Sequence, residues 1–189
     1  MIKIIDNQLP ENLLLKCIEE AENSKAYSVL HGAGDGTQGF KYNWLFFDDR
    51  NKNKIENKII ENLWCEAQKY LPEKIKLHRG YVNAHTYGVE DTIHIDDVEI
   101  NNGITVIVYL CTTWYPEWFG QTIFFKSIDR HNHNEIINSV MPKFNRMLIF
   151  DKNIPHCVSP LSRRFFGVRL TCMFKVEVLN ENTHRSTQS

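Results

Sequence analysis

The hydrophobic pattern changes its period near residue 77, and this change limits the folds that the chain can adopt. Before that point apolar residues recur with helical spacing, whereas after it they alternate with polar residues in short runs rich in β-branched and aromatic side chains. Turn residues separate the runs, which span residues 77–87, 92–96, 104–110, 122–127, 146–151 and 165–178. Many short strands without long helices between them are typical of an antiparallel sandwich or barrel.

Two helices are expected in front of these strands. Pro10 suits the first turn of a helix that runs to about residue 25, and a second helix is predicted from about residue 54 to residue 70, before Pro72. Short strands are expected at residues 2–5 and 43–48. We therefore predict a mostly β protein with flanking helices (α+β), in which the helices pack on one outer face of the β core.

The expected organisation is a single domain over residues 1–189. It consists of a helical N-terminal part (1–75), a β core (76–179) and a polar tail (180–189). The glycine-rich segment "HGAGDGTQGF" (31–40) lacks the lysine of a phosphate-binding loop, and we interpret it as a lid over the substrate.

Composition sets limits on the compartment and on the partners. The five cysteines are odd in number and form no C-x-x-C pair, which favours reduced thiols and a cytoplasmic location. The N-terminus has no uninterrupted apolar run, so neither a signal peptide nor a membrane contact is predicted. The net charge of −1 gives no electrostatic reason to expect a nucleic-acid partner.

A candidate metal site lies in "HTYGVEDTIHIDD", residues 85–97. In a strand, residues i and i+2 point to the same face, so His94 and Asp96 would present an imidazole and a carboxylate to one point. A third ligand is needed, and His156 in "FDKNIPHCVSP" is the candidate, because Pro155 and Pro160 stiffen the chain around it. Two histidines and one carboxylate form the facial triad of non-heme Fe(II) oxygenases.

Simpler explanations compete with a metal site. An isolated H-x-D is more often a surface or hydrogen-bonded pair than a metal site, so the interpretation depends on the downstream segments. His131 and His133 also form an H-x-H pattern, but they lie in the polar run "DRHNHNE", and we interpret them as solvated.

The segment from about residue 77 to residue 175 resembles the iron(II)- and 2-oxoglutarate-dependent dioxygenases of the prolyl hydroxylase type. Four pieces occur in that family's order: "RGYVNAHTYGVEDTIHIDD", "TVIVYLCTTWYPEWFGQTIFF", "NRMLIFDKNIPHCVSPLS" and "VRLTCMFK". The opening "DNQLPENLLLKCI" is similar to the family's first strand and helix. The sequence departs from the family in "GQT", which has one glycine where two are common, and in the longer stretch from His156 to Arg169.

The resemblance implies a double-stranded β-helix core, which is a jelly-roll or cupin-like fold. It also implies an enzyme that couples oxidative decarboxylation of 2-oxoglutarate to hydroxylation of a C–H bond. In that scheme His94, Asp96 and His156 hold Fe(II), while 2-oxoglutarate and O₂ are co-substrates and ascorbate is a further candidate cofactor.

The far carboxylate of 2-oxoglutarate requires a cation, and an arginine offers a two-pronged donor. Spacing from His156 favours Arg164, whereas strand parity favours Arg169, because Arg169 and Thr171 would share one face with Leu170, Cys172 and Phe174 opposite. Arg163 is a third candidate.

Two tyrosines are further candidates for this site. Tyr109 corresponds to a family tyrosine whose hydroxyl reaches the same carboxylate. Parity also groups Tyr87 with other polar residues as a pocket lining, namely Tyr81, Asn83 and His85. Core packing of these aromatic rings is the alternative explanation.

Several functions are compatible with these features. We expect a hydroxylase of a peptidyl residue, most plausibly proline, so the partner would be a protein or peptide. The alternatives are a hydroxylase of a free amino acid or small metabolite, a nucleic-acid demethylase of the AlkB-like type, and a binding module without turnover. Arg169 and Lys175 loosely match the R-x₅-R pattern of the AlkB-like type, with lysine in place of the second arginine.

Overall fold

The computed structural model describes residues 1–25, 28–31, 40–49, 55, 57–89, 91–96, 100–128 and 135–179. Most of the predicted lid, the pair His131 and His133, and the polar tail therefore lie outside the described residues. The helices are α1 (Glu11–Asn23) and α2 (Lys58–Ala67), with short 3₁₀ turns η2 (Gln68–Tyr70) and η3 (Pro116–Trp118). The strands are β1 (Ile2–Asp6), β2 (Ser28–His31), β3 (Phe40–Asp48), β4 (Ile75–His85), β5 (Gly103–Tyr109), β6 (Thr122–Phe125), β7 (Ile136–Val140), β8 (Arg146–Asp151), β9 (His156–Val158) and β10 (Arg169–Val178).

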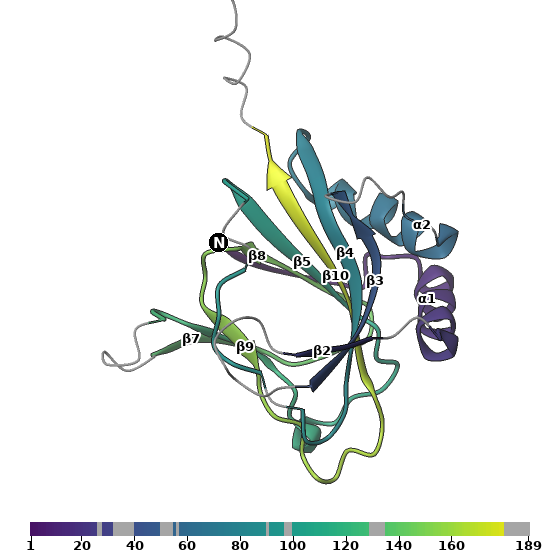
Figure 1. The fold of residues 1–189 in the computed structure, drawn as a ribbon, viewed down its shortest axis with the longest axis vertical. Helices are drawn as coiled ribbons and strands as arrows, with labels where there is room; N and C mark the ends of the chain where they lie inside the picture. Colours follow the sequence, from purple (N-terminus) through teal and green to yellow (C-terminus); the bar gives the residue numbers. More distant parts are fainter. Residues whose placement is uncertain are drawn as a thin grey trace, which may run out of the picture.

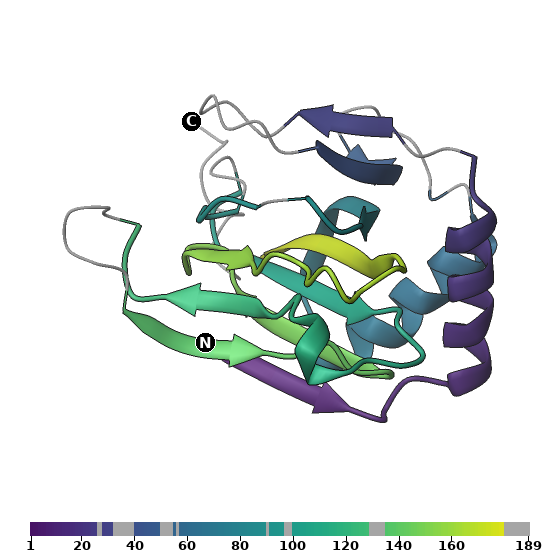
Figure 2. The same ribbon diagram turned by 90° about the horizontal axis from the view of Figure 1, so that it is seen from below.

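Two antiparallel sheets face each other. The large sheet has the order β1-β8-β5-β10-β4-β3-β2, and the small sheet has the order β7-β6-β9. Helices α1 and α2 cover the outer face of the large sheet, while the small sheet lies on its other side (Figures 1 and 2). This is the predicted mostly β fold with helices on one outer face, and the facing sheets form the predicted double-stranded β-helix.

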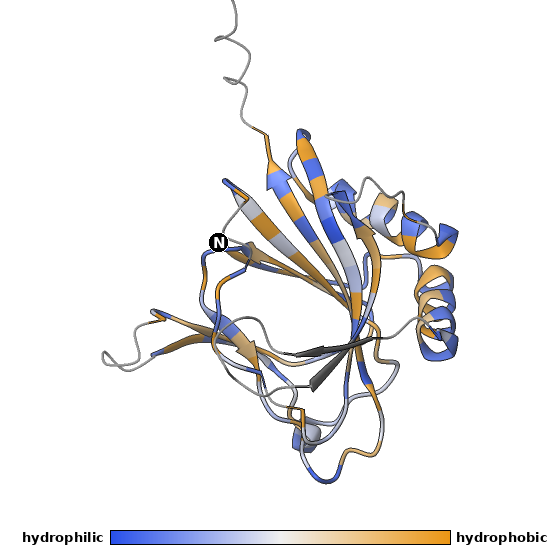
Figure 3. Ribbon diagram, viewed as in Figure 1, coloured by the Kyte–Doolittle hydropathy of each residue, from blue (hydrophilic) through white to orange (hydrophobic). Residues whose placement is uncertain are grey.

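Strand alternation divides the apolar side chains between two cores. On β5, Val106 and Val108 point to the helices, as does Leu110 directly after the strand, whereas Ile107 and Tyr109 point to the small sheet. The same alternation is visible along β4 and β10 as changes of hydropathy from one residue to the next (Figure 3). Because the helices cover the outer face of the large sheet, its inner face is the one that can carry a functional site.

The helices form where local signals and burial agree. Helix α1 starts directly after Pro10 and buries Leu14, Cys17, Ile18 and Ala21 against the sheet. The side chain of Asn57 caps α2 by accepting hydrogen bonds from the backbone N–H groups of Ile59 and Ile60, at 2.9 and 3.1 Å. This cap makes α2 start later than the predicted residue 54.

Three strands were not predicted from the sequence, namely β2, β7 and β9. Strand β7 is an edge of the small sheet and is mostly exposed except for the buried Val140, and β9 has only three residues. Edge and very short strands carry little hydrophobic signal. Within the described part of the chain, no helix is both long enough and apolar enough to span a membrane.

An ion pair fastens the first strand to the large sheet. Asp6 lies opposite Arg146 in the β1–β8 pairing, and its two carboxylate oxygens accept hydrogen bonds from Nε and Nη2 of Arg146, both at 2.8 Å. Lys143 Nζ lies 2.9 Å from Asp6 Oδ2. The hydrogen bonds from Arg146 are the main reason that the pKa of Asp6 falls to about 2.

We expect Asp6→Asn to lower the free energy of unfolding at neutral pH by about 1 kcal/mol, since the pair is ideal in geometry but partly exposed. A depressed carboxylate pKa stabilises the fold above its ordinary value of 3.8, and this contribution is lost as the pH falls towards about 2. Urea titrations at several pH values should therefore show that the difference in the free energy of unfolding between Asp6→Asn and wild type becomes smaller below about pH 4. Glu135→Gln, which breaks an exposed pair with Lys126, is the control and should change little.

Candidate metal centre and co-substrate cavity

Two histidines from distant parts of the chain are brought together by a backbone bridge. The N–H of His94 donates to the carbonyl of His156 at 3.0 Å, and the N–H of His156 donates to the carbonyl of His94 at 2.9 Å. The two imidazole ring centroids are 4.5 Å apart. The predicted pairing of these two histidines in space is therefore a consequence of main-chain hydrogen bonding between the segment around His94 and β9.

The third candidate ligand, Asp96, is fixed in the same way. Its N–H donates to the carbonyl of Lys152 at 2.9 Å, and the N–H of Lys152 donates to the carbonyl of Gly103 at 3.1 Å. The carboxylate of Asp96 turns inward, with its side chain 7% exposed. The segment 94–96 thus runs beside the loop between β8 and β9. Backbone hydrogen bonds to this region fix the positions of both His94 and Asp96.

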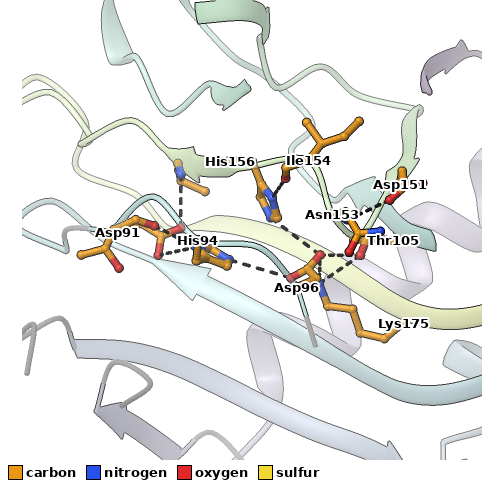
Figure 4. Close-up of polar contacts among 11 residues, drawn as sticks. Asp91, His94, Asp96, Thr105, Asp151, Asn153, Ile154, His156 and Lys175 are labelled. Atoms are coloured by element: carbon orange, nitrogen blue, oxygen red, sulfur yellow. Dashed lines mark hydrogen bonds and ion pairs between the residues drawn. The ribbon is translucent and has the colours of Figure 1, made fainter. Parts of the chain in front are cut away.

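The three side chains converge on one point (Figure 4). His94 Nε2 lies 3.8 Å from Asp96 Oδ1, and His156 Nε2 lies 3.7 Å from Asp96 Oδ2. One ligand atom from each residue falls within 4.8 Å of the other two. Donor atoms that are each about 2 Å from one ion lie roughly 3–4 Å apart, so these spacings fit a single divalent metal ion.

Both histidines are oriented so that Nε2 faces the site. Nδ1 of His94 lies 2.8 Å from the carbonyl of Thr92, and Nδ1 of His156 lies 2.9 Å from the carbonyl of Ile154. A carbonyl can only accept, so each Nδ1 carries the proton and each Nε2 keeps a lone pair. Burial lowers the pKa of His156 to about 4, which keeps its imidazole neutral.

A buried lysine on β10 contacts the carboxylate of Asp96. Lys175 Nζ pairs with Asp96 Oδ2, which also accepts a hydrogen bond from the hydroxyl of Thr105. Burial on its own would raise the pKa of Asp96, but the charge of Lys175, the neighbouring His156 and these hydrogen bonds hold it well below its usual range. Asp96 is therefore an anion at neutral pH.

A cavity opens beside these residues and extends along the inner face of the large sheet. It encloses about 430 Å³ of empty volume, a figure that includes its open mouth. Alternate residues of β10 line it, namely Arg169, Thr171, Met173 and Lys175. The opposite residues of β10, among them Leu170, Cys172 and Phe174, lie in the core under the helices, as parity predicts.

Arg169 occupies the end of the cavity away from Asp96 and is 1% exposed. Its Nε donates to the carbonyl of Gly120 at 2.9 Å, and its Cζ lies 5.4 Å from the ring centroid of Tyr109. Nη1 lies 3.4 Å from Nδ1 of His85, while Nη2 is buried and finds no hydrogen-bond partner among the described residues. A buried guanidinium nitrogen without an acceptor suits an incoming carboxylate.

Gly120 is required at its position beside Arg169. Its φ of +74° is a conformation that L-residues with a side chain rarely adopt. A Cβ there would lie 2.9 Å from the ring of Trp114 and 3.2 Å from Cδ of Arg169. The single glycine of "GQT" thus positions the backbone carbonyl that accepts the hydrogen bond from Nε of Arg169.

Of the remaining predicted residues of the site, some line the cavity and Tyr109 lies behind its wall. Thr171 lines the cavity, as do Tyr81, Asn83 and His85 on β4. Tyr109 is completely buried, and its hydroxyl lies 2.8 Å from Oγ1 of Thr122, so it stands behind the cavity wall and contacts Arg169 through its ring.

The prediction that Tyr87 points into the cavity was wrong. Strand β4 ends at His85, so the alternation of faces no longer applies two residues later. Tyr87 is 50% exposed, and its hydroxyl accepts a hydrogen bond from Nε of Arg163 at 2.9 Å. Arg164 is also exposed and lies in a turn, where its backbone N–H contacts Oγ of Ser162 at 3.2 Å.

Several residues in or beside the cavity were given no role in the site from the sequence, among them Lys175, Thr105 and Asp91. Lys175 shares the parity of Arg169 and Thr171, and Thr105 shares the parity of Tyr109, so strand alternation could have found both. Asp91 lines the cavity, and its Oδ2 accepts the N–H of Val158 at 3.2 Å. It precedes the strand-like segment in the sequence, so no periodic signal marks it.

Two features of the described residues fit Fe(II) and 2-oxoglutarate. The His–Asp–His set offers two nitrogens and a carboxylate, which suits iron, and the buried Nη2 of Arg169 would receive the far carboxylate of a dicarboxylic acid in the same cavity.

Solved structures share this fold at low sequence identity. A prolyl hydroxylase from Trichoplax adhaerens, in complex with a hypoxia inducible factor peptide fragment, is 19% identical with a TM-score of 0.63, over 93% of this chain and 83% of that one. The viral collagen prolyl hydroxylase of Paramecium Bursaria Chlorella virus-1, in its 2-oxoglutarate complex, is 14% identical with a TM-score of 0.65, over 94% and 96%. HygX from Streptomyces hygroscopicus, with nickel, 2-oxoglutarate and hygromycin B bound, is 12% identical with a TM-score of 0.64, over 94% and 82%.

The comparisons with known sequences give a family match but no individual curated relative. No curated protein sequence matches the chain. The sequence profile of the 2OG-Fe(II) oxygenase superfamily matches residues 81–175, which begin in β4 and end in β10 and include His94, Asp96, His156 and Arg169. That match covers half of the sequence and all of the candidate site, and the chain belongs to the 2OG-Fe(II) oxygenase superfamily.

Proposed function

We propose that this oxygenase hydroxylates a C–H bond of a peptidyl proline, with His94, Asp96 and His156 as the metal ligands and Arg169 as the anchor of 2-oxoglutarate. Its superfamily uses Fe(II), 2-oxoglutarate and O₂. The observation that carries the site assignment is that one cavity has three converging metal donors at one end and a buried arginine nitrogen at the other.

The residues of the chain would divide the work as follows. The Nε2 atoms of His94 and His156 and the carboxylate of Asp96 bind the metal, while Arg169 and Thr171 orient the far carboxylate of 2-oxoglutarate. The bound iron and 2-oxoglutarate supply the oxidation. The apolar residues Ile107 and Met173 exclude water from the middle of the cavity.

The choice of peptidyl proline is supported by the solved prolyl hydroxylases that share the fold, one of which is in complex with a peptide. A small polar metabolite is the second candidate. The cavity wall carries Asn83, Asp91 and Thr122, which suit a polar substrate, and HygX was solved with hygromycin B bound.

Substrate-dependent succinate release separates these candidates. The purified protein would be incubated with Fe(II), 2-oxoglutarate and either proline-containing peptides, free amino acids and polar metabolites, or methylated oligonucleotides. We expect stimulation by peptides, with incorporation of one oxygen atom from ¹⁸O₂ into proline detected by mass spectrometry. Stimulation by free metabolites alone would replace peptidyl proline with the second candidate, and stimulation by oligonucleotides alone would contradict both.

The five cysteines all carry free thiols, which is consistent with the proposed cytoplasmic location.

A further inference from the structure

Lys175 is a buried cation in direct contact with a proposed metal ligand. Its side chain is 6% exposed, and its Nζ contacts Asp96 Oδ2 and lies 3.2 Å from Oγ1 of Thr105. The hydroxyl of Tyr81 is a further hydrogen-bond partner of this ammonium group. Burying a lysine is costly unless its charge is paired and its donors are satisfied, and here three partners do both.

The sheet brings Lys175 and Thr105 to the same carboxylate. The two residues are direct partners in the β10–β5 pairing, and both side chains point to the inner face of the large sheet. The pairing of β10 with β4 shifts its register directly after Lys175. Such a bulge changes the direction of the neighbouring side chains and is common next to active sites. Figure 4 shows Lys175 and Thr105 on one side of Asp96, with the histidines on the other.

The two donors occupy one oxygen of Asp96. A carboxylate oxygen offers about two lone-pair directions. On Oδ2, one is taken by the hydroxyl of Thr105 and one by the ammonium of Lys175. Each oxygen also lies near one histidine, because Oδ2 is 3.7 Å from Nε2 of His156 and Oδ1 is 3.8 Å from Nε2 of His94. Only Oδ1 keeps its lone pairs for another partner, since those of Oδ2 are taken by the two donors.

We propose that Lys175 and Thr105 are positioning residues that restrict Asp96 to single-oxygen metal binding through Oδ1. This inference rests on the proposed metal ligands. A six-coordinate ion held by one atom from each of three residues keeps three positions, which a chelating 2-oxoglutarate and O₂ need together. A two-oxygen Asp96 would occupy one of those positions and compete with 2-oxoglutarate.

The test compares metal-loaded protein with and without these donors. Wild type, Lys175→Met, Lys175→Arg and Thr105→Val would be loaded with Mn(II), crystallised, and titrated with 2-oxoglutarate by calorimetry. We expect Asp96 to bind through Oδ1 alone in wild type, and 2-oxoglutarate affinity to fall about 10-fold or more in Lys175→Met and Thr105→Val. Lys175→Arg keeps a cationic donor near Oδ2 and should recover most of the affinity. Lys126→Met removes an exposed, paired lysine and serves as the control.

Two outcomes would overturn the inference. One is a wild-type structure in which both oxygens of Asp96 bind the metal. The other is unchanged 2-oxoglutarate affinity in both Lys175→Met and Thr105→Val. If the loss of the buried charge prevents Lys175→Met from folding, Thr105→Val carries the comparison, because it removes only a hydroxyl at nearly constant volume.

A separate pair of variants tests the site on which the inference rests. His94→Ala and His156→Ala should lose Mn(II) binding. Unchanged Mn(II) binding in both would refute the proposed ligands themselves. Loss of metal in these two variants, together with unaltered behaviour of Lys175→Met and Thr105→Val, would refute only the role of Lys175 and Thr105.

Discussion

Replacing Asp96 with alanine should abolish the formation of succinate from 2-oxoglutarate. Outer-shell partners of a metal site typically cost 10- to 100-fold when removed, so the loss of a ligand should exceed about 100-fold. Asp96→Asn tests the charge separately, because it keeps the size of the side chain but removes the anion that the site holds. We expect it to be nearly as inactive as Asp96→Ala. Wild-type turnover in either variant would contradict the assignment of the metal ligands.

The same substitution also affects stability. Removing the carboxylate leaves the charge of Lys175 buried without its counter-ion, which typically costs about 3–5 kcal/mol. The double variant Asp96→Ala/Lys175→Met removes both charges, and we expect it to recover most of the stability but none of the activity. A double variant that is stable and inactive would show that the loss of turnover comes from the missing ligand rather than from unfolding. Glu135→Ala, which breaks an exposed pair, is the control for losing a carboxylate beside a lysine.

Strand parity predicted the face of the sheet on which a residue lies wherever a strand was long and one of its faces was apolar. On β10 the sequence places Leu170, Cys172 and Phe174 opposite Arg169 and Thr171, and the structure has the first three in the core and the last two on the cavity. A slip of one residue would bury the arginine among the helices, so the hydrophobic pattern fixes the register.

Parity failed where the strand ended. Tyr87 follows the last residue of β4 and turns outward to Arg163. Tyr109 shows a second limit of parity. Parity predicts the face of the sheet to which a side chain points, but it does not predict whether that side chain lines the cavity or is buried behind the cavity wall. The hydroxyl of Tyr109 contacts Thr122 of the opposite sheet, and the position of that sheet depends on tertiary packing.

The contact between Lys175 and Asp96 could not be predicted from either segment alone. It requires the pairing of β10 with β5 and the backbone bridge that sets the segment 94–96 beside Lys152. Both are long-range features of the folded chain. Strand alternation places Lys175 on the same face as Arg169, but a lysine on an inner face has no assigned partner until the sheets are in place.

Arg169 should be the residue on which the apparent affinity for 2-oxoglutarate depends most. Arg169→Ala removes a buried, charge-assisted contact, which is typically about 1.5–3 kcal/mol or more, and we expect the KM for 2-oxoglutarate to rise by about two orders of magnitude. Arg169→Lys keeps the charge, but its ammonium group lacks the planar set of donors that can bind the Gly120 carbonyl and a carboxylate together. We therefore expect an intermediate KM. The affinity of both variants for Mn(II) should stay close to wild type, because Arg169 lies at the opposite end of the cavity from the metal donors.

Arg164→Ala and Arg163→Ala are the matched controls, and each should change the KM by a few-fold at most. Arg164 lies in an exposed turn, and Arg163 donates to the exposed hydroxyl of Tyr87, so neither side chain is part of the cavity lining. Spacing from His156 had favoured Arg164, whereas burial and the unpartnered Nη2 favour Arg169. A larger rise in KM for Arg164→Ala than for Arg169→Ala would reverse this assignment. A rise for Arg169→Ala with lost Mn(II) binding would instead indicate collapse of the whole site, which the thermal stability of the variant would reveal.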